Sequence, residues 1–177
     1  MKKIIALLLA AVMVMCLFAG CASSGGSKVI KIGVFEPQSG DNGAGGKQEV
    51  LGIQYANSVK PTVTIGGEEY KIELDIQDNQ SSTDKAVSAA QQLVADKVSV
   101  VLGSYGSGVS IAAGTYFANA KIPAIGCSCT NAAVTAGNDY YFRVCFLDPF
   151  QGSVMASFAM EEFGAKKAYV LSMLGDD

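Results

Sequence analysis

The sequence contains no histidine and no tryptophan, and only 4 of its 177 residues are proline. Without histidine the chain cannot assemble a Ser-His-Asp triad, and a zinc site would lack one of the two commonest zinc ligands. Charged residues make up only 16% of the chain and form no basic cluster. The net charge is −3, and it becomes more negative once Lys2 and Lys3 are left out. We therefore expect no nucleic-acid partner.

Half of the residues are hydrophobic, and apolar residues recur with alternating strand and helix periods along the chain. This order predicts an α/β fold with a doubly wound parallel sheet. The glycine-rich stretch 36–46 predicts a loop, 61–67 a connector with a hairpin-like turn at Gly66-Gly67, and the hydroxyls of residues 81–83 predict a helix cap. The predicted strands are 28–35, 70–78, 98–102, 122–126, 140–145 and 167–173, and the predicted helices are 48–59, 85–96, 109–119 and 153–163.

The first 21 residues have the pattern of an export signal. Lys2 and Lys3 precede an apolar run, residues 4–18, that is short for a membrane span. Phe18-Ala19-Gly20-Cys21 resembles a bacterial lipobox, which predicts a lipoprotein signal peptide over 1–21 with lipid on Cys21. An ordinary secretory signal, with Cys21 incidental, is the alternative. Residues 22–28 then form a flexible tether, and the rest lies outside the cytoplasm, in the periplasm or at the outer face of the plasma membrane.

Three further cysteines follow the predicted signal: Cys127, Cys129 and Cys145. The spacing of Cys127 and Cys129 is compatible with a metal or redox pair, but a single C-x-C without histidine is a weak pattern. Small buried residues at strand ends are the favoured interpretation. We therefore expect no metal and no cofactor.

Two turns rich in small polar residues each follow a predicted strand. Residues 103–108 connect strand 98–102 to a helix, and Ser128-Cys129-Thr130 follows strand 122–126. In a parallel sheet both turns lie at the carboxyl edge, where a helix N-terminus favours an anion. Hydroxyls and carbonyls of the second turn can accept from an ammonium group. The two turns together predict a site for a small zwitterion.

Five segments in order resemble one protein family. They are Lys31-Ile32-Gly33-Val34-Phe35-Glu36-Pro37-x-Ser39-Gly40, Asp78-Asn79-Gln80, Gly103-Ser104-Tyr105-Gly106-Ser107, Ile122-Pro123-Ala124-Ile125-Gly126 and Phe142-Arg143-Val144-Cys145-Phe146-x-Asp148-Pro149-Phe150-Gln151-Gly152. Over residues 29–177 the chain is similar to the branched-chain amino-acid (leucine/isoleucine/valine) binding proteins of bacterial ABC importers. The resemblance implies the type I periplasmic-binding-protein fold, in which two α/β lobes enclose a ligand.

The resemblance also implies roles for individual residues. Ser107 would hold the ligand's carboxylate through its hydroxyl and N–H, while the Ser128 carbonyl and the Thr130 hydroxyl would hold its ammonium group. Tyr105, Gly106 and Cys129 belong to the same two turns and complete the expected ligand-binding set. Some family members carry an aromatic residue where this chain has Gly45, a wall that Tyr105 would replace unless it faces solvent. An acidic partner for the ammonium is expected from the second lobe, beyond Asp177.

The resemblance divides the chain into an incomplete first lobe, residues 29–147, and the crossing into a second lobe, residues 148–177. Residues 147–152 are the hinge candidate. Because a strand followed by an acidic turn normally continues into a helix, we expect the sequence to be the front part of a longer protein; a chain that ends with an edge strand is the alternative. A front part alone would leave apolar faces bare, which predicts poor solubility.

The implied function is capture of an amino acid, with branched-chain types favoured, for an ABC permease and ATPase complex. An enzyme is disfavoured, because residues 126–130 end in threonine where a G-x-S-x-G elbow needs glycine, and residues 103–108 lack the P-loop lysine. A ligand-sensing receptor of the same fold remains an alternative. Other amino acids, small amides and related compounds also remain open as ligands.

Overall fold

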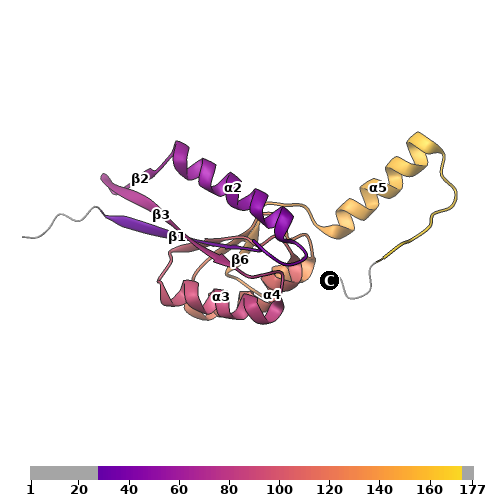
Figure 1. Ribbon diagram of the computed structural model, residues 1–177. Coiled ribbons are helices and arrows are strands. Elements are labelled where there is room, and N and C mark those ends of the chain that lie inside the picture. Colours follow the sequence, from indigo (N-terminus) through magenta and orange to yellow (C-terminus); the bar gives the residue numbers. More distant parts are fainter. Residues whose placement is uncertain (1–27, 173–177) are drawn as a thin grey trace, which may run out of the picture.

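The computed structural model describes residues 28–172 and consists of a six-stranded sheet with helices on both faces (Figure 1). The strand order is β2-β3-β1-β4-β5-β6, and all neighbours run parallel except β2 and β3. Helix α2 covers one face, whereas α3 and α4 cover the other (Figure 1). The predicted doubly wound α/β fold is therefore confirmed, with one antiparallel edge strand added.

The strands are β1 (Val29–Glu36), β2 (Thr62–Ile65), β3 (Glu68–Asp78), β4 (Val100–Leu102), β5 (Ala124–Gly126) and β6 (Tyr141–Arg143). The helices are α2 (Gly43–Val59), α3 (Thr83–Ala95), α4 (Ser107–Ala120), the short 3-10 helix η2 (Ala132–Val134) and α5 (Asp148–Phe163).

The hydrophobic core lies between the sheet and the pair α3 and α4. Phe35 of β1 and Phe117 of α4 are fully buried and meet edge to face with ring centroids 5.6 Å apart. Ala86, Ala90 and Leu93 of α3 add an apolar stripe, as their helical spacing predicts. This packing holds the ends of β1 and β4 next to the start of α4.

Helix α2 begins at Gly43, so the prediction of a loop through residue 46 is wrong for its last four residues. Gly43 and Gly46 pack closely against the loop that follows β1. A Cβ on Gly46 would lie 2.0 Å from the Pro37 carbonyl oxygen, and the Gly46 N–H donates to the Asn42 carbonyl at 3.1 Å. Glycine at this position lets the first turn of the helix lie directly on the loop that leaves β1.

The predicted connector 61–67 contains β2, which pairs with β3 through a turn at Gly66 and Gly67. Both glycines have positive φ, as a tight hairpin requires, so the hairpin turn is confirmed and the missing strand is a correction. The predicted cap of α3 is also corrected. Ser82 occupies the N-cap without a side-chain hydrogen bond, and the Ser81 hydroxyl donates to the Ser39 carbonyl at 3.0 Å instead.

Helix α5 extends away from the sheet and buries none of its residues (Figure 1). It begins at Asp148 with Pro149 in its first turn, so it includes most of the predicted hinge 147–152 and is longer than predicted. Residues 164–172 form no regular element, and the strand predicted over 167–173 is therefore wrong for 167–172. Tyr169 and Leu171 are fully exposed, and a strand needs a neighbour for its backbone groups.

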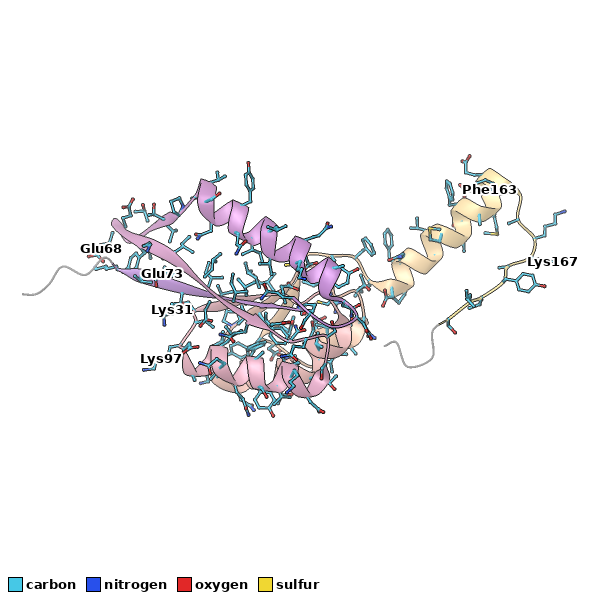
Figure 2. The ribbon with its side chains drawn as sticks, viewed as in Figure 1. Lys31, Glu68, Glu73, Lys97, Phe163 and Lys167 are labelled. Atoms are coloured by element: carbon cyan, nitrogen blue, oxygen red, sulfur yellow. The ribbon has the colours of Figure 1, made fainter. Side chains whose placement is uncertain are left out.

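Several charged side chains lie at the end of the sheet opposite to α5. Lys31, Glu68 and Glu73 lie at that end in Figure 2, while Phe163 and Lys167 lie at the far end of α5. Lys28 pairs with Glu68, and Lys71 pairs with Glu73 at 3.3 Å. Within residues 28–172 no helix has both the length and the apolar character that crossing a membrane requires.

Candidate functional site

The candidate site lies at the carboxyl edge of the sheet, where the direction of strand addition reverses. Strand β1 lies between β3 and β4, so the chain adds strands on both sides of β1. In open α/β sheets such a reversal is the usual place for a ligand. Two turns meet there: the first turn, residues 103–106 after β4, and the second turn, residues 127–131 after β5.

The first turn is packed tightly against the end of β1. A Cβ on Gly103 would lie 2.1 Å from the Phe35 carbonyl oxygen, and φ at this residue is +121°. Both the close approach of the backbone and the positive φ therefore require glycine. The buried Ser104 hydroxyl accepts from the Asn79 side-chain amide at 2.8 Å. The Tyr105 N–H donates to Glu36 at 2.6 Å. Gly106, also at positive φ, is the N-cap of α4.

Ser107 is the first residue of α4 and joins the two turns. Its hydroxyl oxygen accepts from the Asn131 N–H at 3.2 Å. This hydrogen bond reaches out of the helix to the second turn. The residue is buried, with 8% of its surface exposed. A hydroxyl that accepts one hydrogen bond still has its own proton to donate. Ser107 therefore offers a donor at a helix N-terminus, next to the second turn.

The second turn is fixed from three sides. The Ser128 hydroxyl donates to Glu49, and the Thr130 carbonyl accepts from the Asp148 N–H at 3.1 Å. The Arg143 guanidinium donates to the Cys129 and Asn131 carbonyls, both at 2.9 Å. The turn is therefore held rigidly beside Ser107 and is connected to the start of α5.

The three cysteines are free thiols, and their environments differ. Cys129 is buried, and a Cβ on Gly126 would lie 2.0 Å from its sulfur, which agrees with a small buried residue at a strand end. Cys127 and Cys145 are only half-buried, so the same prediction is wrong for them.

The Tyr105 ring packs against Gly45, the position where the resemblance implied a missing aromatic wall. A Cβ on Gly45 would lie 2.5 Å from the ring, so the two residues are in direct contact. Tyr105 is 38% exposed, which leaves part of the ring facing outwards. The ring therefore covers the surface that glycine leaves bare, from the opposite side of the site.

Glu36 and Glu49 are site residues that the sequence analysis missed. Glu36 ends β1 and is fully buried, while Glu49 lies in the second turn of α2 and is half-buried. Burial, followed by the hydrogen bond and charge of Glu49, raises the pKa of Glu36 to about 9, and the Tyr105 N–H lowers it in part. Glu36 thus keeps its proton at neutral pH and shares a hydrogen bond with Glu49.

Within the part of the chain that the structure describes, the same two carboxyl groups and Cys127 form a group of three side chains close enough together to hold a metal ion. One ligand atom from each lies within 4.8 Å of the other two. Burial, together with the charges of Glu49 and Glu36, raises the pKa of the Cys127 thiol to about 12. Glu36 and Glu49 share a hydrogen bond, so the two carboxyl groups form a pair beside the Cys127 thiol.

The chain matches the family model described as periplasmic binding protein over residues 29–174. A Leu/Ile/Val-binding protein homolog 1 of Brucella abortus is 32% identical over 144 residues, which cover 80% of this chain and 38% of that protein. The crystal structure of the leucine-binding protein LivK of Thermotoga maritima matches with 38% identity and a TM-score of 0.71, over 78% of this chain and 39% of LivK.

A second solved structure is equally similar. The branched-chain amino acid transporter substrate-binding protein LivJ of Streptococcus pneumoniae, in complex with isoleucine, has 36% identity and a TM-score of 0.71 over 78% of this chain and 40% of LivJ. The chain thus spans about two fifths of the length of the relatives it matches. Since the family model covers nearly all of the sequence, this chain belongs to the periplasmic binding protein family.

Proposed function

We propose that this chain carries the first ligand-binding lobe of a solute-binding protein that captures a branched-chain amino acid for import by an ABC transporter. The observation that carries the proposal is the hydrogen bond from Asn131 to Ser107, which brings the two turns together at a helix N-terminus. Relatives named for leucine, isoleucine and valine support the choice of ligand. The family is one of binding proteins rather than enzymes, which supports capture without chemistry.

Ser107 is the proposed partner of the ligand's carboxylate. Its hydroxyl already accepts from Asn131, so its proton remains free to donate to an anion. The N-terminus of α4 adds backbone N–H groups and the positive end of a helix dipole. Gly106 has no side chain, so the carboxylate can approach this backbone closely.

The second turn is the proposed partner of the ligand's ammonium group. The Ser128 hydroxyl is engaged by Glu49, which leaves its backbone carbonyl as the acceptor, and the Thr130 hydroxyl is the second acceptor. Cys129 contributes by fixing the turn between these two residues, because its side chain is buried and its carbonyl accepts from Arg143. Each charge-assisted hydrogen bond contributes about 1.5–3 kcal/mol before the costs of binding.

Tyr105 is the proposed wall for the ligand's side chain. Its ring lies on Gly45 at the edge of the site and is partly exposed, so it offers an apolar surface beside the two turns. A branched aliphatic side chain gains binding free energy from such a surface, at roughly 25 cal/mol per Å² buried.

The remaining parts of the proposal concern the whole protein. Family membership supports a location outside the cytoplasm. Lipid on Cys21, the signal peptide 1–21 and the tether 22–28 lie outside the described residues and stay proposals, as do the permease and ATPase partners. The lobe boundary at residues 147–148 and the hinge are proposals as well; the Thr130–Asp148 hydrogen bond would connect ligand contacts to the hinge.

The test measures leucine, isoleucine and valine binding to the full-length protein by calorimetry. Ser107→Ala and Thr130→Val should each weaken binding at least tenfold, because each removes one hydrogen bond to a charged group of the ligand. Thr130→Ser keeps the hydroxyl and should stay within threefold of the wild type. Unchanged affinity in both Ser107→Ala and Thr130→Val would mean that the ligand binds elsewhere.

A further inference from the structure

We propose that the Glu36–Glu49 carboxyl pair supplies, within the first lobe, the negative charge that selects a ligand carrying an ammonium group. This inference rests on the proposed function, because it assigns a specificity role at the same site. Each carboxyl group of the pair is hydrogen-bonded to one of the two turns. Glu36 accepts from the Tyr105 N–H at 2.6 Å, and Glu49 accepts from the Ser128 hydroxyl.

Each carboxyl group has one buried oxygen for which no other described residue provides a hydrogen-bond donor, so that these two oxygens are left to each other. These are Oε1 of Glu36, whose residue is fully buried, and Oε2 of Glu49. One proton held between two facing carboxyl oxygens satisfies both of them. The two groups face each other, because their hydrogen bond is one of the effects that keep the proton on Glu36.

The charge that remains on the pair has no positive partner among the described residues. The ion pairs within residues 28–172 join Lys28 to Glu68 and Lys71 to Glu73, at the opposite end of the sheet. Arg143, on β6 beside the second turn, donates to the Cys129, Asn131 and Ala132 carbonyls and to the Thr135 hydroxyl. The negative charge behind the second turn is therefore uncompensated until a cation arrives.

The ligand's ammonium is the cation that the geometry provides for. The Ser128 hydroxyl points its hydrogen at Glu49, and the Ser128 carbonyl belongs to the same residue that is proposed to accept from the ammonium. The Glu49 carboxylate, hydrogen-bonded to the side chain of that same residue, would attract an ammonium group held at the carbonyl. An α-hydroxy acid has the same shape and carboxylate but no positive charge, so it gains nothing from the pair.

The experiment compares two ligands in the full-length protein, in buffer containing EDTA so that no bound metal contributes. The probes are whichever of leucine, isoleucine and valine binds most tightly, and the α-hydroxy acid of the same carbon skeleton. The measured quantity is the ratio of their dissociation constants. Glu49→Gln keeps the acceptor for Ser128 and removes the charge, so the preference for the amino acid should fall at least fivefold. Glu69→Gln, an exposed site on β3, is the matched control and should leave the ratio unchanged.

The outcomes separate this inference from the proposed function. A wild-type protein that binds none of the three amino acids would overturn the proposed function and this inference with it. Amino-acid binding with the same ratio in Glu49→Gln as in the wild type would overturn the inference alone. A Glu49→Gln protein that loses affinity for both ligands equally would also overturn it, because that result assigns Glu49 a structural role only.

Discussion

The buried Glu36 carboxyl group is protonated at neutral pH, so the stability of the folded protein depends on pH. In the unfolded chain its carboxyl ionises near the ordinary pKa of 4.5, whereas burial and Glu49 raise the pKa to about 9 in the folded protein. Between these two values the unfolded state releases a proton that the folded state keeps. The free energy of unfolding should therefore fall as pH rises from 4.5 to 9, by up to about 1.4 kcal/mol per pH unit, and the contribution is complete below pH 4.5.

We expect Glu36→Gln to flatten this slope. The amide can accept from Tyr105 and donate to Glu49, so it replaces the protonated acid without any titration. Denaturant unfolding at pH 5, 7 and 9 should show the variant gaining stability relative to the wild type as pH rises. Glu69→Gln is the exposed control. A constant difference between Glu36→Gln and the wild type across this range would contradict the buried protonated state.

Tyr105 and Gly45 should behave as a coupled pair. Gly45→Ala places a methyl group where the ring lies, so it should displace Tyr105 and weaken ligand binding several-fold. In a Tyr105→Ala background the same substitution meets open space and should have little further effect. Calorimetry on the four proteins of this cycle measures the coupling. Additive effects of the two substitutions would mean that the ring does not form the wall of the site.

At the scale of elements, the start of α2 depends on its contact with Pro37. Gly46→Ala puts a Cβ 2.0 Å from the Pro37 carbonyl oxygen, and it should lower the free energy of unfolding by at least about 2 kcal/mol. Gly52 lies in the same helix with open space around it. Gly52→Ala should raise the stability by about 0.5–1 kcal/mol, since alanine is the better helix former. Thermal unfolding of both variants checks the contrast, and equal effects of the two substitutions would contradict it.

Most elements of the fold could be predicted because their apolar periods are long and clear. Strand β3 alternates over residues 70–78 and α3 carries an alanine and leucine stripe, so both predictions lie close to the observed bounds. Strand β2 has only four residues, too few for a period, and its hairpin turn was the stronger signal. The start of α2 was misjudged because Gly43 and Gly46 serve close packing, which looks the same as a loop in the sequence.

Of the candidate site, the sequence predicts the two turns but not the two glutamates. The turns around Ser107 and Ser128 follow strands, and the chirality of a parallel sheet brings such turns together. Glu36 and Glu49 belong to different elements, and an isolated glutamate resembles a surface residue. One signal was present in the sequence: Glu36 directly follows the apolar run of β1, at the edge of a parallel sheet where ligand sites lie.

At the scale of the whole molecule, α5 exposes a row of apolar side chains. Phe150, Val154 and Phe158 follow one another at helical spacing, with 63%, 47% and 50% of their surface exposed. Such a row on one helix face normally packs against another element. The second lobe of the proposed binding protein would provide that element.

We therefore expect the 177-residue polypeptide to self-associate when it is produced alone. Light scattering after size-exclusion chromatography should show species larger than a monomer, because α5 and the apolar groove between α2 and the sheet both remain open. Replacing Phe150, Val154 and Phe158 with glutamate should reduce the association, while the same change at the exposed polar positions Gln151, Ser153 and Ser157 should not. A monomeric wild-type polypeptide with a sharp cooperative melt would show that these faces need no partner, and α5 would then have to be explained as a solvated helix.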